Sequence, residues 1–126
     1  MIYTSYFSKL RYLPNTMIPV SISRKPPRWY KGLQYRLLAP NWNIIYEHKT
    51  THNDDLFAQQ YRDEVLANRR VFQVHRDLEM LQLSRDSEKR FDVVLLSYER
   101  PSDFSHRHIV AEWLTEHGYP CEELKF

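Results

Sequence analysis

One continuous apolar run, residues 91–97, restricts the fold of this chain more than any other feature. It reads Phe-Asp-Val-Val-Leu-Leu-Ser, which is typical of a central strand that is covered on both faces. A polar loop over 98–104 follows, and apolar residues then recur at helical spacing over 105–117. A buried strand that leads through a loop into a helix indicates an α/β protein with a parallel sheet.

The rest of the chain supplies further strands and helices for such a fold. Residues 2–7 and 17–22 are rich in β-forming side chains and predict two strands, and 119–126 predicts a last one. Pro19 indicates that the second strand begins late or lies near a sheet edge. The other predicted elements are a short helical turn within 8–15, helices from Asn53 to about Asn68 and over 71–81, and a polar turn over 85–89.

With 126 residues the chain has the length of one domain, and we expect a single α/β domain over 1–126. The order of elements predicts a three-layer α/β sandwich with a mostly parallel sheet of about four to five strands. Residues 23–43 fit neither a helix nor a lasting strand, because three prolines interrupt them. A long irregular segment in a small domain is usually functional or disordered, and its aromatic residues argue against disorder.

The glycine and cysteine contents exclude several kinds of site. Gly32 and Gly118 are the two glycines, too few for a Walker A loop or a glycine-rich dinucleotide turn, and Gly118 is placed to end the helix before it. Cys121 is the single cysteine, which excludes an internal disulfide framework and a Cys-rich zinc site. The six histidines lack a clean ligand spacing, so we predict neither a metal nor a cofactor.

The sequence predicts a cytoplasmic location. The first residues lack the basic start and long apolar stretch of a secretory signal. No apolar run approaches the roughly 20 residues that span a bilayer, so no membrane partner is expected. A single cysteine also fits a reducing compartment.

Charge is divided unequally along the chain. Residues 1–50 hold eight Lys or Arg against one acid, a net charge of +7, whereas 51–126 hold ten basic and fifteen acidic residues, a net charge of −5; together they give the chain's +2. This division predicts an anion-binding face supplied by the first half. The alternative is that the two halves attract each other within the fold.

The loop at 98–104 and the helix after it form the first candidate site. Ligands of parallel sheets bind at the carboxyl ends of strands, where helix N-termini attract anions. Ser105 suits the N-cap position, and His106 and Arg107 share the buried face of the helix at its open end. The candidate acid–base groups are Glu99 and His106, and the candidate ligand contacts are Tyr98, Ser105 and Arg107.

Structural roles compete with these assignments. Arg107 can be a structural guanidinium that binds backbone carbonyls or Glu99, and Glu99 can be its ion-pair partner instead of an acid–base group. His106 can be a hydrogen-bonded residue of the helix start, and Ser105 can be only a cap. His108 is expected to project toward solvent. The remaining residues predicted on the buried face of the helix are Val110, Trp113, Leu114 and His117.

Residues 24–32 form a second candidate site. Four cations alternate here with two aromatic residues and a glycine. Binding of phosphate and a base requires charge, rings for stacking, and a bare backbone for close approach, although any exposed basic loop has a similar composition. The candidate ligand contacts of this segment are Arg24, Arg28, Trp29, Tyr30 and Lys31, and the end of the first strand adds Ser5 and Tyr6.

Two motifs resemble the DUF488 family. That family ends a strand with Leu-Leu-Cys-Tyr-Glu and opens a helix with Cys-His-Arg, and residues 95–99 and 105–107 read Leu-Leu-Ser-Tyr-Glu and Ser-His-Arg here. Residues 3–7, 21–24 and 29–35 resemble the N-terminal half of the short variant found in phages and bacteria. The resemblance implies a Rossmann-like α/β fold and a phage or bacterial setting. It implies no substrate, because the family name records an unknown function.

The chain departs from the family at both motif cysteines, which are Ser97 and Ser105 here. A thiolate is a far better nucleophile than an unactivated hydroxyl, so a mechanism that requires the thiolate is lost. Serine still forms hydrogen bonds to an anion. The substitution therefore favours a binding protein over a thiol enzyme.

The favoured prediction is a protein that binds a phosphorylated, nucleotide-like ligand or another anion in a cleft at the carboxyl end of the sheet. Ser105 and Arg107 would hold a phosphate, while Trp29 or Tyr30 stacks on a base. If a phage encodes the chain, this binding takes place in the host cytoplasm.

A single anion site of this kind requires Arg24 or Arg28 within about 10 Å of Arg107, with Glu99 among them as the counter-charge. Two other functions stay open. One is a hydrolase of a nucleotide, a phosphoester or an N-glycosidic bond that uses Glu99 or His106. The other is an interaction module that docks protein or nucleic acid through residues 24–36. The oligomeric state is not predicted.

Overall fold

The protein is built on a five-stranded, fully parallel sheet within residues 1–83 and 91–125, which the computed structural model describes. The strand order is β3–β2–β4–β1–β5, so the apolar run of the sequence is the central strand β4. The polar turn predicted over 85–89 and the last residue, 126, lie outside the described residues. The strands are β1 Ile2–Tyr6, β2 Met17–Ser21, β3 Leu33–Gln34, β4 Asp92–Ser97 and β5 Cys121–Glu123.

Helical segments connect the strands except β2 and β3, which an irregular loop joins, because parallel strands need a connection that crosses back over the sheet. The α-helices are α1 Trp42–Thr51, α2 Asp54–Gln60, α3 Val71–Leu81 and α4 His106–Glu116. The shorter helices are the 3₁₀ helices η1 Phe7–Tyr12, η2 Arg36–Leu38 and η4 Leu66–Asn68, and the π-helix η3 Tyr61–Val65.

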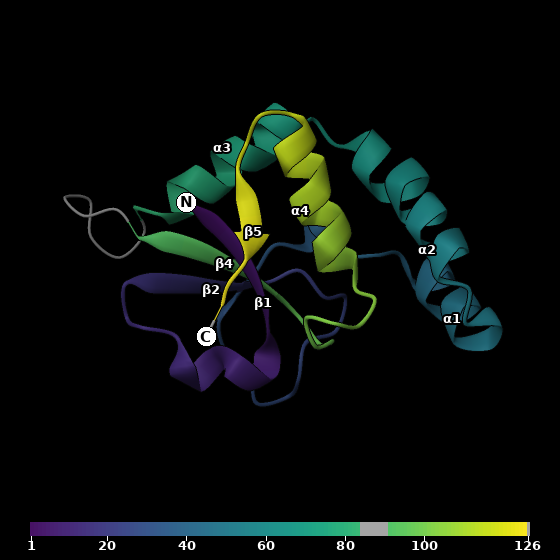
Figure 1. The fold of residues 1–126 in the computed structure, drawn as a ribbon, viewed down its shortest axis with the longest axis horizontal. Coiled ribbons are helices and arrows are strands. Elements are labelled where there is room, and N and C mark those ends of the chain that lie inside the picture. Colours follow the sequence, from purple (N-terminus) through teal and green to yellow (C-terminus); the bar gives the residue numbers. More distant parts are fainter. Residues whose placement is uncertain (84–90, 126) are drawn as a thin grey trace.

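Three layers are visible when the sheet is seen on edge, with α3 and α4 on one side and η1 on the other (Figure 1). The alternation along β4 follows this division. Val93 and Leu95 belong to the core that includes α3 and α4, whereas Val94 and Leu96 pack with Phe7 of η1. The prediction of a three-layer, Rossmann-like α/β fold is confirmed.

The central strand is buried as the sequence predicts, since all four side chains from Val93 to Leu96 have no exposed surface. The next strand, β2, explains how a proline is tolerated beside it. β3 pairs with β2 only from Val20 onward. The missing N–H of Pro19 therefore breaks no hydrogen bond between β2 and β3. The second strand therefore lies near an edge, and it does not begin late.

Helix α2 begins where the sequence predicts. The side chain of Asn53 accepts a hydrogen bond from the backbone N–H of Leu56 over 3.0 Å, which caps the helix. From Tyr61 the same helical segment continues as η3 and η4 and ends at Asn68. The predicted helix over 53–68 is thus present, but it is not α-helical throughout.

Helix α4 also begins and ends as predicted, although two of its histidines do not lie where we expected. Ser105 caps its start, and Gly118 follows its end with a φ of 87°, a conformation that glycine adopts without strain. His117 is exposed and not on the buried face, because α4 ends at Glu116 and His117 is its C-cap residue, with Nδ1 beside the carbonyl of Trp113. His108 is half-buried and not solvent-directed, and its Nε2 is buried.

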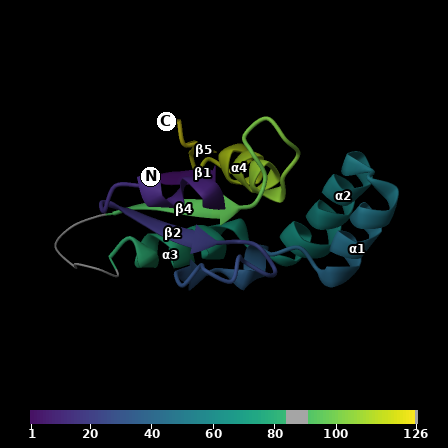
Figure 2. The ribbon, with the colours of Figure 1, turned by 90° about the horizontal axis from the view of Figure 1, so that it is seen from below.

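Helix α1 is the longest of the elements that the sequence did not predict. Residues 23–43 are largely irregular, as predicted, but they also contain β3, η2 and the start of α1. Ile44 is the one buried residue of α1, so the helix has no apolar stripe that a periodicity search detects. Figure 2 shows α1 and α2 beyond the end of the sheet toward which the β4 arrow points. This helical hairpin therefore lies at the carboxyl end of the sheet.

Candidate functional site

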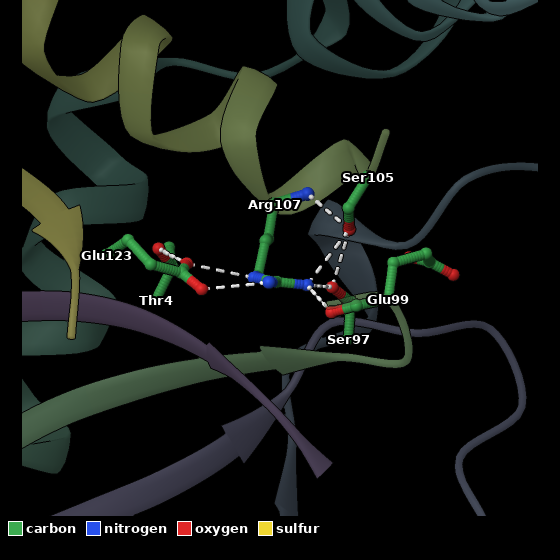
Figure 3. Close-up of polar contacts among 6 residues, drawn as sticks. All are labelled: Thr4, Ser97, Glu99, Ser105, Arg107 and Glu123. Carbon is green, nitrogen blue, oxygen red and sulfur yellow. Dashed lines mark hydrogen bonds and ion pairs between the residues drawn. The ribbon is translucent and has the colours of Figure 1, made fainter. Parts of the chain in front are cut away.

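Arg107 is the centre of a buried polar cluster where α4 begins (Figure 3). Its side chain is completely buried. Nε and Nη2 donate to the two carboxylate oxygens of Glu123 over 3.0 and 2.8 Å. Nη1 donates to the Ser97 hydroxyl over 2.8 Å and to the backbone carbonyl of Glu99 over 2.6 Å. The two parallel bonds to one carboxylate are the strong geometry for arginine.

The carboxylate partner of Arg107 is Glu123 and not Glu99. In Figure 3 the Glu99 side chain points away from the guanidinium, and only its backbone carbonyl accepts a bond. The Thr4 hydroxyl donates a hydrogen bond to the Glu123 carboxylate over 2.7 Å and so helps to hold it beside Arg107. The centroid of the Tyr6 ring lies 5.7 Å from the guanidinium carbon of Arg107. No local sequence pattern pairs Glu123 with Arg107, because the two residues are 16 positions apart and lie on different elements, β5 and α4.

Ser97 and Ser105, which replace the motif cysteines, contact each other. Their hydroxyl oxygens lie 2.6 Å apart and share a hydrogen bond. The Ser105 oxygen also accepts from the backbone N–H of Arg107 over 3.4 Å, which confirms the predicted cap. Both hydroxyls are therefore engaged within the protein.

A cavity of ≈ 430 Å³ lies beside this cluster, between the start of α4, the loop after β2, and α1. Its wall comes from segments that are far apart in the sequence. The residues that line it are Ser23, Arg24, Lys25, Pro40, Trp42, Ile45, His48, Lys49, Phe57, Tyr98, Glu99, Phe104, Ser105 and His106.

Positive charge outweighs negative charge on this wall. Arg24, Lys25 and Lys49 are the lysine and arginine residues among those lining it, and Glu99 is the acid. Arg24 is held in place by bonds from Nε to the Pro40 carbonyl over 3.1 Å and from Nη2 to the Ala39 carbonyl over 3.4 Å. The N-terminus of α4 adds the positive end of a helix dipole. The cavity is therefore suited to an anion.

Ser23 contributes a buried hydroxyl to the same wall. The residue is 5% exposed, and among the described residues its Oγ has no hydrogen-bond partner. Its Oγ accepts nothing from Ser21, whose own hydroxyl instead accepts from the Ser23 backbone N–H over 3.2 Å. A buried polar group without a partner costs free energy, and a polar ligand atom in the cavity offsets that cost.

His106 presents a neutral imidazole to the cavity. Its Nε2 lies 2.8 Å from the Ile22 carbonyl, which only accepts, so Nε2 carries the proton. Burial lowers the pKa of His106 below its ordinary value, although the Ile22 bond opposes this. The neutral ring therefore has its lone pair on Nδ1, as a proton acceptor requires.

His48 is a second imidazole in the cavity wall, and no pattern in the sequence marked it as a site residue. Its Nε2 lies 2.7 Å from a carboxylate oxygen of Asp54. Its ring stacks on Phe104, with the ring centroids 5.6 Å apart. Because His48 lies on the unpredicted helix α1, only that helix could have brought it to the site; Trp42 and Lys49 were missed for the same reason.

The basic segment 24–32 divides between the cavity and other parts of the surface. Arg24 and Lys25 line the cavity, and the Tyr98 hydroxyl donates to the Lys25 carbonyl and so holds the loop against it. Arg28, Trp29 and Lys31 are exposed and do not line the cavity. The structure therefore does not gather the residues of this segment into one contact surface at the cavity.

Tyr30 is a core residue and does not offer a ring for stacking. It is 6% exposed, and its hydroxyl donates to the Leu33 carbonyl over 2.6 Å and to the Pro19 carbonyl over 3.2 Å. Gly32 serves this packing, because a Cβ there would lie 2.5 Å from the Tyr30 oxygen. Its missing side chain makes room for Tyr30 and not for a ligand.

Three other predicted ligand contacts, Ser5, Tyr6 and Arg107, do not line the cavity. Ser5 is completely buried, and among the described residues its Oγ has no partner. Tyr6 covers the guanidinium of Arg107, which is itself enclosed. Of the predicted site, the structure brings together Arg24, Tyr98, Glu99, Ser105 and His106 in one cavity.

Comparison with known proteins places the chain in a family. The model DUF488-N3a, described as the active DUF488-N3 subclade, matches residues 5–118. No curated protein and no solved structure matches the chain. Among the described residues, no helix has the length and apolar character to cross a membrane, and no group of three His, Cys, Asp or Glu side chains is arranged to hold a metal ion. Because the family match extends over most of the chain and includes both motifs, this protein belongs to the DUF488 family.

Proposed function

We propose that the protein binds a phosphorylated, nucleotide-like ligand in the cavity between α1 and the start of α4. The observation that carries the proposal is the composition of the cavity wall, in which three cations and one acid lie beside aromatic rings. Its volume of ≈ 430 Å³ is within the usual range of small-molecule sites. A cleft lined by charge of one sign raises the local concentration of counter-ions, here of anions.

The wall supplies separate groups for the two parts of such a ligand. The lysines and the α4 N-terminus attract phosphate, and the Ser23 hydroxyl offers a hydrogen bond that no described residue uses. Trp42 and Tyr98 line the cavity and are 45% and 49% exposed, so their ring faces are accessible to a base. We place this binding in the cytosol, as the sequence predicts, and in a host cell if a phage encodes the chain.

Thermal shift and isothermal titration against a panel of nucleoside mono-, di- and triphosphates, inorganic phosphate and free nucleosides test the proposal. We expect a phosphorylated nucleoside to bind at least about tenfold more tightly than either of its parts, because charge and ring contacts act together. Lys25→Ala with Lys49→Ala should weaken binding, whereas Lys31→Ala, an exposed lysine outside the cavity, should not. No binding across the panel would contradict the proposal.

A hydrolase is the second candidate, and the state of His106 favours it. Its neutral ring, held by the Ile22 carbonyl, can accept the proton of a water molecule that attacks a phosphoester or N-glycosidic bond. The proton that His106 accepts can then pass to the leaving group. Glu99, whose carboxylate does not bind Arg107, lines the same cavity as the second acid–base group. The description of the matching subclade as active agrees with a reaction at this site.

Measurement of product release from the ligand that binds best distinguishes the two candidates. If the protein is a hydrolase, Glu99→Gln and His106→Gln should each lower turnover by about 100-fold or more while ligand binding is largely kept. Retention of full turnover in both variants would exclude these residues as the acid–base pair. Absence of turnover with tight binding would leave the binding function alone.

A further inference from the structure

Helix α1 carries two stacked aromatic side chains that lead from the cavity to the surface. Trp42 lines the cavity and is 45% exposed, and Tyr46, one turn later, is 59% exposed and does not line it. The ring centroids lie 5.7 Å apart, with an angle of 22° between the ring planes. Exposed aromatic surface thus extends along α1 from the cavity wall at Trp42 to Tyr46.

Positive charge accompanies these rings. The ammonium of Lys49 lies 5.8 Å from the centroid of the Tyr46 ring, and Lys49 also lines the cavity. Of the three acids on α1 and α2, Asp55 is exposed, and Glu47 and Asp54 are engaged within the hairpin. Glu47 accepts from the side-chain amide of Gln60 over 2.7 Å, and Asp54 lies 2.7 Å from the imidazole of His48. The exposed rings therefore lie beside one lysine, Lys49, which also lines the cavity.

This combination is typical of surfaces that bind single-stranded nucleic acid, where bases stack on rings and lysines meet the phosphates between them. A mononucleotide in the cavity would leave Tyr46 unused, because that residue lies outside the wall. We propose that the ligand is a single-stranded nucleic acid chain, with one nucleotide in the cavity and the neighbouring base stacked on the Trp42–Tyr46 pair. The inference rests on the proposed function and extends it from a nucleotide to a chain.

Anisotropy titrations with fluorescein-labelled oligothymidylate and oligouridylate of about eight nucleotides, beside calorimetry with thymidine and uridine monophosphate, test the inference. The oligonucleotide should bind roughly tenfold or more tightly than the mononucleotide, because one further base stacks outside the cavity. Tyr46→Ala should remove most of this gain and leave the affinity for the mononucleotide unchanged.

Two control variants separate this inference from the proposed function. Phe72→Ala removes a ring that is equally exposed, at 59%, but lies on α3, and it should change neither affinity. Lys25→Glu reverses a charge of the cavity wall and should weaken both ligands. Circular dichroism and thermal unfolding of each variant confirm that the fold is kept.

The possible outcomes are distinct. Equal affinities for the oligonucleotide and the mononucleotide, or equal effects of Tyr46→Ala and Phe72→Ala, would overturn the inference and leave the proposed function intact. Oligonucleotide binding that Lys25→Glu does not weaken would overturn it too, since the cavity would then take no part. Failure of the mononucleotide to bind counts against the proposed function itself. A protein partner that depends on Tyr46, without nucleic acid binding, would also overturn the inference.

Discussion

Arg107 connects three segments of the chain, and because it is completely buried its main role is structural. Its guanidinium meets the Glu123 carboxylate, the Ser97 hydroxyl and the Glu99 carbonyl, so the end of β4, the start of α4 and β5 share one group. A buried cation is stable only when such bonds surround it. Arg107 therefore shapes the cavity from behind, through Ser105 and the Glu99 backbone, and is not among the residues that line it.

Removal of the guanidinium should destabilise the protein strongly. Arg107→Ala leaves Glu123 without its partner and should lower the free energy of unfolding by about 3–5 kcal/mol, measured by chemical denaturation. Arg62→Ala is the matched control, because its pairs with Glu112 and Glu116 are partly exposed and are worth roughly 0–1 kcal/mol. Where Arg107→Ala does not fold, Glu123→Gln reports the same pair. Equal losses at Arg107 and Arg62 would contradict the structural role.

Stability should fall below about pH 6.5 because of His106. Its pKa is lowered in the folded protein, so the unfolded chain binds more protons in the range between the folded pKa and the ordinary value near 6.5. The free energy of unfolding should therefore drop by up to about 1.4 kcal/mol per pH unit in that window, and be recovered above it. Urea titrations at several pH values measure the slope.

The slope should depend on this one histidine. In His106→Gln the acid-dependent loss should become smaller, even though the variant is less stable at every pH without the native Ile22 contact. His117→Gln removes an exposed histidine and should leave the slope unchanged. An unchanged slope in His106→Gln would show that the imidazole is not held neutral.

At the scale of elements, the loop between β2 and β3 is fixed by the packing of Tyr30 over Gly32. The hydroxyl binds two carbonyls, and burial raises the pKa of Tyr30 to about 12, so it stays a donor at all ordinary pH values. A methyl group at position 32 would meet the Tyr30 oxygen at 2.5 Å and the ring carbon at 2.7 Å. The loop that carries Arg24 and Lys25 therefore depends on this glycine.

Gly32→Ala should lower the free energy of unfolding by about 1–3 kcal/mol, since the buried ring must move. Lys31→Ala, at the exposed neighbouring position, should change it by less than about 0.5 kcal/mol. Thermal and urea unfolding of the two variants measure the difference. Equal stabilities would mean that the ring moves aside freely, contrary to the tight packing described above.

Elements with a strong local pattern were predictable from the sequence, and those placed by long-range contacts were not. Short stretches of sequence were sufficient to predict the apolar strand β4, the Asn53 cap and the Ser105 cap, because each depends on residues only a few positions apart. Helix α1 buries only Ile44, so no periodicity marks it. Glu123 and the cavity wall depend on strand register and on α1, which no local pattern specifies.

At the scale of the whole molecule, part of the excess positive charge of the first half of the chain is found in the cavity wall. The three cations of the cavity wall all belong to residues 1–50. The described arginine–carboxylate pairs, Arg62 with Glu112 and Glu116 and Arg107 with Glu123, lie within the second half. These positions favour the interpretation that the first half supplies an anion-binding surface.

Ligand affinity should accordingly fall as salt concentration rises. Between about 0.05 and 0.5 M sodium chloride, the affinity for a nucleoside monophosphate should decrease several-fold, because added ions screen the cavity cations. The double variant Lys25→Ala with Lys49→Ala should show a weaker dependence. Calorimetry at a series of salt concentrations measures it, and an affinity independent of salt would contradict an electrostatic site.

The position of a bound nucleotide, determined by crystallography of the complex, tests the central claim most directly. We expect its phosphate beside Lys25, Lys49 and the Ser23 hydroxyl, at the start of α4, with its base against Trp42 or Tyr98. A nucleotide bound instead on the exposed surface of residues 28–31, with the cavity taking no part, would contradict the proposed site.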